Sequence, residues 1–188
     1  MNVIGIVGEN ASGKDELAQY VEKKHGGEVI STGQIVRELA ENEKIEPTRE
    51  KLHELSKRYM EEEGRDFIAR KVIEAIEDSD AETVAVSGVR TPEDAQTLRE
   101  HFDGDFILAH TDVSLPFARF ERSQERRSER DPDNFDEFQK QDHEEDRLFN
   151  LGQTIKMADI RINNDGVLGA FHEQIEKKLI DRYLKDGD

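Results

Sequence analysis

Cysteine is absent from this chain, which excludes both disulfide bonds and thiolate metal sites. Positive charge is scarce too: 27 lysines and arginines stand against 44 aspartates and glutamates, a formal net charge of −17. Such a field repels nucleic acid and anionic membranes, because binding to either depends on neutralising phosphate. We therefore expect neither nucleic acid nor a membrane as a partner.

The sequence also lacks long apolar runs, targeting signals, repeats and convincing linkers. Met1 to Val7 is apolar but far too short to span a membrane, so we expect a cytoplasmic protein. The 188 residues are 34% hydrophobic and 38% charged, and apolar runs recur along the whole chain. This composition fits one heavily solvated domain over residues 1–188 rather than disorder.

Short β-rich runs alternate with helical patterns along the chain. Strands are expected at Asn2–Val7, Glu28–Ser31, Thr83–Val86, Phe106–His110 and Asp159–Ile162. Helices are expected at 13–25, 32–42, 47–63, 65–77, 92–101, from 115 onward, 136–157 and 167–184. Strands separated by helices indicate parallel pairing through right-handed crossovers. The pattern therefore predicts an α/β fold, a three-layer doubly wound parallel sheet of about five strands with ligand sites at the strands' carboxyl ends.

A phosphate-binding loop follows the first expected strand. Residues 8–14 read G-x-x-x-x-G-K, between a strand and a helix, as the P-loop mechanism requires. The loop's N–H groups and the helix N-terminus favour phosphate, and the lysine reaches the β and γ phosphates of ATP. An ordinary glycine-rich turn is the alternative. The expected nucleotide contacts are Gly8, Asn10, Ala11, Ser12, Gly13 and Lys14.

The residue after the P-loop lysine departs from the usual pattern. A Ser or Thr hydroxyl at this position normally binds Mg²⁺, but here the residue is Asp15. The third expected strand ends at Ser87, where P-loop proteins usually carry an acidic residue associated with Mg²⁺. We hypothesise that Asp15 and Ser87 have exchanged roles around the metal. Alternatively, Asp15 only favours the first helical turn, where carboxylates are stabilising.

Two further segments resemble the acceptor-binding parts of adenylate-kinase-like enzymes. Ser31-Thr32-Gly33-Gln34-Ile35-Val36-Arg37 looks like the segment in which a Thr and an Arg contact a nucleoside monophosphate. Ser87-Gly88-Val89-Arg90 resembles the strand-end segment whose Arg binds the acceptor phosphate. The resemblance implies that Thr32, Arg37 and Arg90 bind the acceptor, in a P-loop fold of the nucleoside monophosphate kinase type. Taken singly, Thr32 can be read as a helix N-cap and Arg37 as a solvated residue.

Arginines cluster in the middle of an otherwise acidic chain. Arg119, Arg122 and Arg126 recur at spacings of three and four, with Arg127 and Arg130 following. Guanidinium groups can meet the charge that develops during phosphoryl transfer. We interpret residues of about 119–140 as a short lid in which Arg122, Arg126 and Arg130 join Lys14 in catalysis. The alternative is a surface helix in which these arginines pair with interleaved glutamates.

The segment Ala158-Asp159-Ile160-Arg161-Ile162-Asn163-Asn164-Asp165-Gly166 resembles the last strand and turn of dephospho-coenzyme A kinases and related archaeal kinase-like proteins. There the equivalent turn lies near the nucleotide base, so the resemblance implies that Asn164 and Gly166 contact the base of ATP. Read without it, Asn-Asp-Gly is only a turn.

Together these features predict a Mg²⁺- and ATP-dependent kinase that phosphorylates a nucleotide-like small molecule. A (deoxy)nucleoside monophosphate is the first choice of acceptor, and dephospho-coenzyme A is the alternative. Residues of about 43–78 would form a helical acceptor-binding arm. A regulatory nucleotide-binding NTPase without an acceptor is the alternative of another class.

Overall fold

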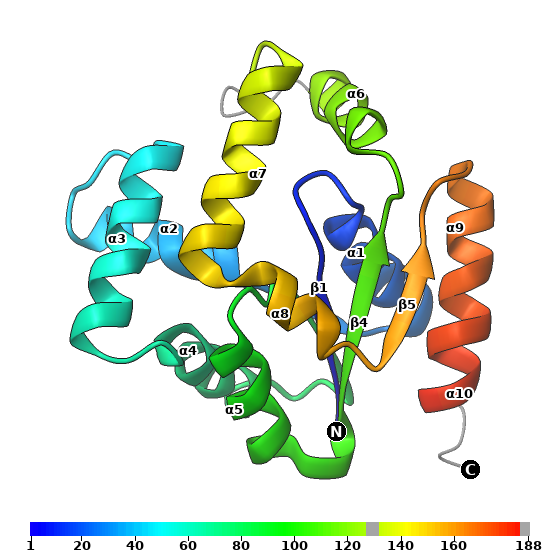
Figure 1. Cartoon of the computed structure of the whole chain (residues 1–188). Helices are drawn as coiled ribbons and strands as arrows, with labels where there is room; N and C mark the ends of the chain where they lie inside the picture. The colour runs from blue at the N-terminus through cyan, green and yellow to red at the C-terminus, as the bar shows by residue number, and fades with distance from the viewer. Residues whose placement is uncertain (127–131, 185–188) are drawn as a thin grey trace.

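One parallel β-sheet forms the centre of the computed structural model, which describes residues 1–126 and 132–184 (Figure 1). Its strand order is β2-β3-β1-β4-β5, and each neighbouring pair is parallel. The strands are β1 (Asn2–Val7), β2 (Glu28–Ser31), β3 (Thr83–Ser87), β4 (Phe106–Asp112) and β5 (Ile160–Asn163). The predicted fold class is confirmed: this is a doubly wound P-loop fold.

Helices connect the strands and account for most of the remaining described residues. They are α1 (Lys14–His25), α2 (Thr32–Asn42), α3 (Arg49–Glu62), α4 (Phe67–Glu77), α5 (Pro92–Phe102), η1 (Asp103–Asp105), α6 (Pro116–Arg126), α7 (Phe135–Phe149), α8 (Leu151–Lys156), α9 (Leu168–Ile175), the π-helical η2 (Glu176–Ile180) and α10 (Asp181–Tyr183). Within residues 1–126 and 132–184, none of these helices combines the length and the apolar character that crossing a bilayer demands.

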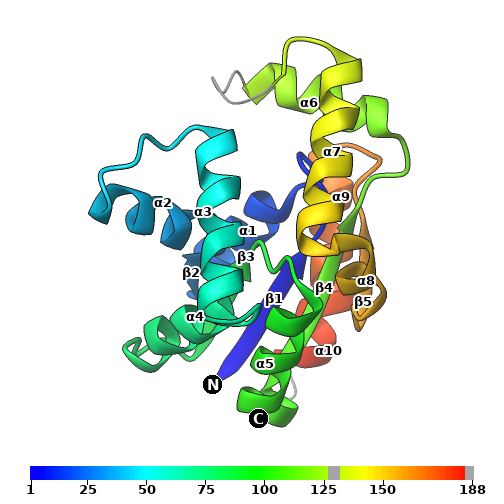
Figure 2. The same ribbon diagram turned by 60° about the vertical axis from the view of Figure 1, so that its left-hand side comes forward.

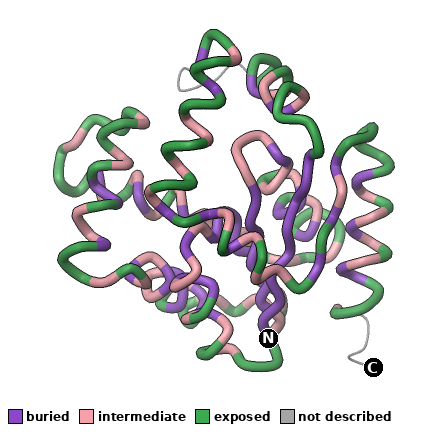
Figure 3. Tube along the Cα trace, in the orientation of Figure 1, coloured by how far each residue is buried: buried purple, intermediate pink, exposed green. Residues whose placement is uncertain are grey.

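The sheet is buried on both faces, as Figure 3 shows for the central strands. Along β1, Val3 and Val7 pack into one core with α4, α5 and α8, whereas Ile4 and Ile6 pack into the other with α1, α9 and η2. Successive side chains of a strand point to opposite faces, so a strand covered on both sides reads as a continuous apolar run. The run Asn2–Val7 therefore reflects a three-layer sandwich with β1 at its centre.

A smaller core joins α2 to α3 at the side of the sheet (Figures 1 and 2). Val36, Ala40 and Leu55 form its buried centre, and Ile68 of α4 packs against them. The rest of the apolar face of α4 belongs to the sheet's main core. The segment of about 43–78, expected to act as one arm, is thus divided: α3 packs on α2, and α4 is part of the layer that covers the sheet.

The helix expected over 136–157 is broken in two. Asn150 adopts a left-handed conformation with φ 59°, ends α7 and leads into α8. Its N–H donates to the Asp146 carbonyl at 2.7 Å, and the Gly152 N–H donates to the Asp146 carboxylate at 2.7 Å. Asparagine tolerates this backbone region better than most residues, so it ends a helix without a glycine. The break turns α7 away from the sheet while α8 stays packed on it (Figure 1).

Some expected boundaries also move by a few residues. Ser31, not Thr32, caps α2, and its hydroxyl accepts the Gln34 N–H at 3.3 Å. Thr48 caps α3, which therefore begins after Pro47 rather than at it. The β4 strand continues two residues beyond His110. The two helix shifts come from local side-chain hydrogen bonds that cap the helix termini. The β4 strand is longer because Thr111 and Asp112 pair with Ile162 and Asn163 of β5.

A buried carboxylate connects α4 to the start of α5, directly after the Val89-Arg90 segment. Asp94 accepts the Ala69 N–H at 3.0 Å and the Thr91 N–H at 3.4 Å, and the Thr91 hydroxyl accepts the Asp94 N–H at 2.9 Å. Burial raises the pKa of Asp94 to about 6, although these hydrogen bonds act in the opposite direction. Asp94 therefore caps one helix and holds a second one against it.

We expect Asp94→Ala to lower the free energy of unfolding by about 2 kcal/mol, because it removes a capping box and leaves the buried Ala69 N–H without its acceptor. Urea unfolding at pH 7 measures the change. Glu100→Ala removes an exposed carboxylate from the same helix and should stay within about 0.5 kcal/mol of the parent. Equal losses in the two variants would contradict this assignment.

Candidate active site

The P-loop lies between β1 and α1, at the carboxyl edge of the sheet. Ala11 has φ 58° and Gly13 has φ 103°, so the backbone curls in a way that extended or helical residues do not allow. The Lys14 ammonium donates to the Gly8 carbonyl and to the Glu9 carbonyl, both at 2.7 Å. In this state the lysine closes the loop on itself, and phosphate oxygens are the natural replacement for these two carbonyls.

The charge of Lys14 is only partly balanced by its surroundings. Burial lowers the pKa of Lys14, whereas the carboxylates of Glu145, Asp15 and Glu9 raise it and Arg90 lowers it further; the net shift is downward. A buried ammonium gains most from an added anion. The site is therefore electrostatically suited to a ligand that brings negative charge to Lys14.

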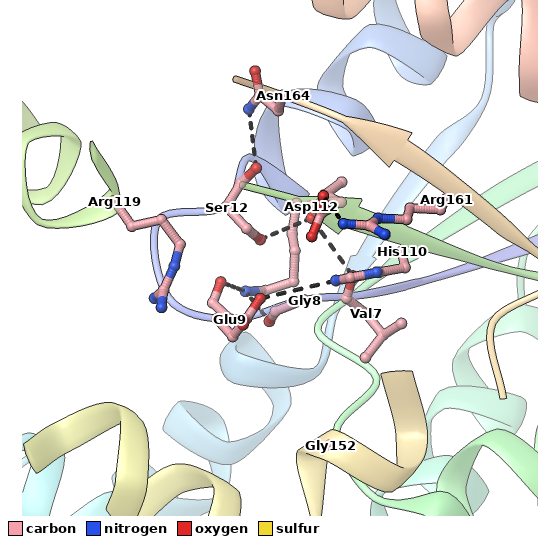
Figure 4. A network of polar contacts seen from close by, with 12 residues as sticks. Val7, Gly8, Glu9, Ser12, His110, Asp112, Arg119, Gly152, Arg161 and Asn164 are labelled. Atoms are coloured by element: carbon pink, nitrogen blue, oxygen red, sulfur yellow. Dashed lines mark hydrogen bonds and ion pairs between the residues drawn. The ribbon is translucent and has the colours of Figure 1, made fainter. Parts of the chain in front are cut away.

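Side chains from β4, β5 and α6 hold the loop from outside (Figure 4). The Ser12 hydroxyl lies 2.8 Å from the Thr111 hydroxyl, and the Asn164 amide donates to the Ser12 carbonyl at 2.9 Å. Arg119 donates to the Asn10 carbonyl at 3.1 Å. Because these contacts take up carbonyls and a hydroxyl, they fix the loop without using its N–H groups.

Asn164 was expected at the nucleotide base through the kinase resemblance. In the structure the Asn164 side chain is buried against the P-loop. The main-chain carbonyl of Asn164 accepts a hydrogen bond from Arg122 at 2.7 Å. Gly166, two residues on, lines the same cavity as the loop. Asn164 therefore supports the phosphate loop through its side chain, and its expected contact with the nucleotide base stays a prediction.

Behind the loop, Glu9 faces a buried histidine of β4 (Figure 4). Glu9 Oε2 lies 3.8 Å from His110 Nε2. Burial by itself would raise the pKa of Glu9, but the interaction with His110 and the charge of Arg119 outweigh it and lower the pKa. Glu9 is therefore held as a carboxylate beside His110 of β4 and Arg119 of α6. In the sequence, His110 follows the continuous apolar run of β4, which gives no signal of this pair.

Asp15 and Ser87 meet directly, as the hypothesis of exchanged roles requires of their positions. The Ser87 hydroxyl donates to Asp15 Oδ1 at 2.7 Å. Asp15 begins α1 and Ser87 ends β3, so the contact joins two elements that are 72 residues apart. Both residues line the cavity, and a carboxylate beside a hydroxyl is a donor set that Mg²⁺ accepts.

The residues expected to bind the acceptor lie on the other side of Asp15. Thr32 is buried and its hydroxyl donates to the Gly88 carbonyl at 2.7 Å, which joins α2 to the segment after β3. Arg37 donates to the Gln34 side chain at 3.0 Å. Arg90 lies over the Phe149 ring, with 5.1 Å from its Cζ to the ring centroid. Thr32 thus positions backbone, while Arg37 and Arg90 line the cavity.

The arginines of α6 have different environments. Arg119 is buried, lies over the Phe138 ring and pairs with Asp142 at 2.7 Å, so it is bound into the protein. Arg122 and Arg126 line the cavity, and Arg126 reaches the Asn10 side chain at 3.5 Å. Arg127 and Arg130 lie outside the described residues. The helix therefore places Arg122 and Arg126 at the cavity, while Arg119 holds the backbone of the P-loop.

One cavity of about 680 Å³ brings these groups together. Its walls come from the P-loop, the starts of α1 and α2, α3, the Ser87–Arg90 segment, α6, α7 and the turn after β5. The lining also includes residues that the sequence did not single out, among them Arg49, His53 and Glu145. They lie in charged helices whose composition resembles a solvated surface, so no local pattern separates them from their neighbours.

Comparisons with known proteins agree with this fold. A family profile described as an AAA domain matches residues 7–139. A UPF0200 protein from Methanoregula boonei is 34% identical over 176 residues, which cover 93% of this chain and 94% of that protein.

Solved structures with kinase names have the same fold. Shikimate kinase from Acinetobacter baumannii, in complex with shikimate, superposes with a TM-score of 0.57 at 14% identity, covering 98% of this chain and 96% of that one. A gluconokinase from Sinorhizobium meliloti gives a TM-score of 0.55 at 14% identity, covering 92% and 88%. At such identities the likeness establishes the architecture alone.

We expect Gly8→Ala to weaken ATP binding at least about tenfold. A Cβ at Gly8 would lie 2.7 Å from the Thr111 carbonyl and 2.6 Å from the Ser12 hydroxyl, so the loop would have to shift. Calorimetric titration with a non-hydrolysable ATP analogue measures the effect. Gly104→Ala adds a Cβ that meets nothing within 4 Å and should bind like the parent. Unchanged affinity in Gly8→Ala would show that the loop is not the nucleotide site.

Proposed function

The chain belongs to the UPF0200 family of P-loop proteins with an AAA domain, and we propose that it is a small-molecule kinase. It transfers the γ-phosphoryl group of ATP, with Mg²⁺, to a nucleotide-like acceptor, first of all a (deoxy)nucleoside monophosphate. The observation that carries this proposal is a cavity in which the P-loop and arginines from several other elements line the same space.

The cationic groups divide into two sides of that cavity. Lys14, Arg122 and Arg126 lie on or near the P-loop, and Arg37, Arg49 and Arg90 lie toward α2 and α3. Guanidinium groups bind phosphate bidentately, so each side fits one phosphorylated ligand. Buried donors without a partner among the described residues, the Asn10 amide and Arg122 Nη1, also suit an anionic ligand. This supports a donor nucleotide and an acceptor bound together.

Asp15 and Ser87 are the residues that we assign to the metal. Their direct hydrogen bond places a carboxylate and a hydroxyl beside the P-loop lysine. A Mg²⁺ ion held by these two residues would neutralise negative charge on the donor phosphates. The carboxylate also lies in the first turn of α1, where the helix dipole stabilises it whether or not a metal is present.

Catalysis by the chain's own residues rests on position and charge. The loop N–H groups and Lys14 hold the donor phosphates, and Lys14 exchanges its carbonyl partners for phosphate oxygens. Arg122 and Arg126 approach from α6 and meet the charge on the transferring group. Arg37 and Arg90 align the acceptor for in-line transfer, so no covalent intermediate is needed. We propose that α3 acts as the acceptor-side arm and α6 with α7 as the lid.

The names of the structural neighbours support a small molecule as the phosphate acceptor, but they do not favour one chemical class of acceptor. One neighbour is named as a shikimate kinase and the other as a gluconokinase. Arginines on the acceptor side favour an acceptor with a phosphate, which a nucleoside monophosphate and dephospho-coenzyme A both carry. A regulatory NTPase would not need such a second set of arginines.

We expect ADP to form from Mg·ATP only when an acceptor is present. Coupled ADP assays with ribo- and deoxyribonucleoside monophosphates, dephospho-coenzyme A, shikimate and gluconate test the proposal, with GTP as a second donor. Nucleoside monophosphates should give the highest kcat/KM. Equal ADP formation with and without acceptors, or none under any condition, would eliminate the kinase.

The exchange of metal residues gives a separate prediction. Asp15→Ser should lower Mg²⁺-dependent kcat/KM roughly 10- to 100-fold, since it removes the carboxylate beside the phosphates. The double variant Asp15→Ser, Ser87→Asp should recover much of that loss because it restores the usual arrangement. Full activity of Asp15→Ser alone would refute the exchange.

A further inference from the structure

A carboxylate of α7 lies between two arginines on the acceptor side of the cavity. Glu145 Oε2 is 3.1 Å from Arg49 Nη2, and Glu145 Oε1 is 3.6 Å from Arg90 Nε. Arg49 comes from α3, Arg90 follows β3, and Glu145 comes from α7. Three elements that are distant in sequence therefore converge on one oxyanion.

The surroundings keep Glu145 ionised. Burial raises the pKa of this carboxyl, but Arg90, Lys14, Arg49 and His53 lower it by more, so the net shift is downward. Only 12% of the Glu145 side chain is exposed. Burial and the Arg49 charge lower the pKa of His53, whereas the Glu145 charge raises it; the net shift is downward. The groups facing Glu145 thus form a cationic environment for one negative charge.

The Glu145 carboxylate does not provide hydrogen-bond acceptors for all the donors of Arg49 and Arg90. Arg49 Nε is buried and has no hydrogen-bond partner within the part of the chain that the structure describes. The 3.6 Å between Glu145 and Arg90 Nε exceeds a normal hydrogen bond. A buried donor without a partner costs free energy, so the arrangement favours any ligand that supplies further acceptors. All three residues line the cavity with the P-loop.

We propose that Arg49 and Arg90 form the binding site for the acceptor's phosphate and that Glu145 is its built-in stand-in, which the acceptor displaces. This inference rests on the proposed kinase function and narrows its acceptor to a phosphate monoester. A phosphate dianion has more charge and one more oxygen than a carboxylate, so it pairs with both guanidiniums at once. An acceptor that offers only a carboxylate gains little over Glu145 itself. The internal competitor therefore acts as a specificity-determining residue.

Glu145→Gln tests the displacement directly, because it keeps the side chain's shape and removes its charge. We expect the KM for the nucleoside monophosphate to fall about fivefold or more, and by a larger factor than the KM for ATP, because the Glu145 charge also acts on Lys14 but is paired directly with Arg49. Glu144→Gln is the matched control, since it removes the neighbouring, exposed carboxylate of the same helix. A higher or unchanged acceptor KM in Glu145→Gln overturns the proposal.

A double-mutant cycle shows whether the effect passes through Arg49. Arg49→Gln should raise the acceptor KM, and adding Glu145→Gln to it should lower that KM less than it does in the parent, because only the pairing with Arg90 is then left to displace. An undiminished effect of Glu145→Gln in the Arg49→Gln background would mean that general electrostatics, not displacement, is responsible. If Glu145→Gln does not fold, Glu145→Asp retracts the carboxylate from the arginines and should lower the acceptor KM less strongly; no decrease overturns the proposal.

Inorganic phosphate separates this inference from the kinase proposal. Its binding is measured by calorimetric titration without nucleotide, in the parent, Glu145→Gln and Glu144→Gln. Tighter phosphate binding in Glu145→Gln alone, with no acceptor turned over by any variant, would support the oxyanion site and reject the kinase. Turnover of nucleoside monophosphates with identical phosphate binding in all three proteins would reject the oxyanion site and leave the kinase.

Discussion

The structure depends on the contacts that hold the P-loop in its curled form. One contact lies within the loop, where the Ser12 N–H donates to the Glu9 carbonyl at 3.2 Å, because buried backbone donors require partners. The supports from outside act on acceptors and a hydroxyl instead: the Ser12 carbonyl accepts from Asn164, and the Ser12 hydroxyl contacts Thr111. Gly8 and Gly13 lie where a Cβ would collide with Thr111 or Asn164, which is why the supports can approach so closely.

These supports require the sheet order that the fold provides. Thr111 is near the end of β4, and Asn164 directly follows β5, two strands beside β1 on the same side. Their carboxyl ends meet the loop because all five strands are parallel. The other side of β1 brings Ser87 of β3 to Asp15 and the Gly88 carbonyl to Thr32. The two halves of the sheet thus have different tasks: one holds the loop, and the other forms the wall on which we propose the metal and acceptor sites.

The protein is strongly acidic as a whole, but positively charged side chains gather around one cavity. The chain carries a net charge of −17, yet arginines from α2, α3, α6 and the segment after β3 line one cavity. Two of them, Arg49 and Arg90, are paired with Glu145, and Arg119, which is buried outside the cavity lining, is paired with Asp142. Pairing keeps buried guanidiniums tolerable without a ligand, because an uncompensated buried charge is costly. The cavity lining therefore carries more positive than negative side chains, in contrast to the acidic chain as a whole.

The sequence alone determined the strands, the layers and the P-loop, because each rests on a local pattern: a continuous apolar run, helical periodicity, and glycines at the spacing of a phosphate loop. It also placed Asp15 and Ser87 at neighbouring strand ends. Only the tertiary structure decided the partners. Asn150 ends a helix although the polar sequence pattern runs on past it. Asn164 supports the loop, and the lining of the cavity includes Arg49, His53 and Glu145. The physical reason is that a charged residue on a polar helix looks the same in sequence whether it faces water or a site, and only the packing of α3 and α7 around the cavity distinguishes the two.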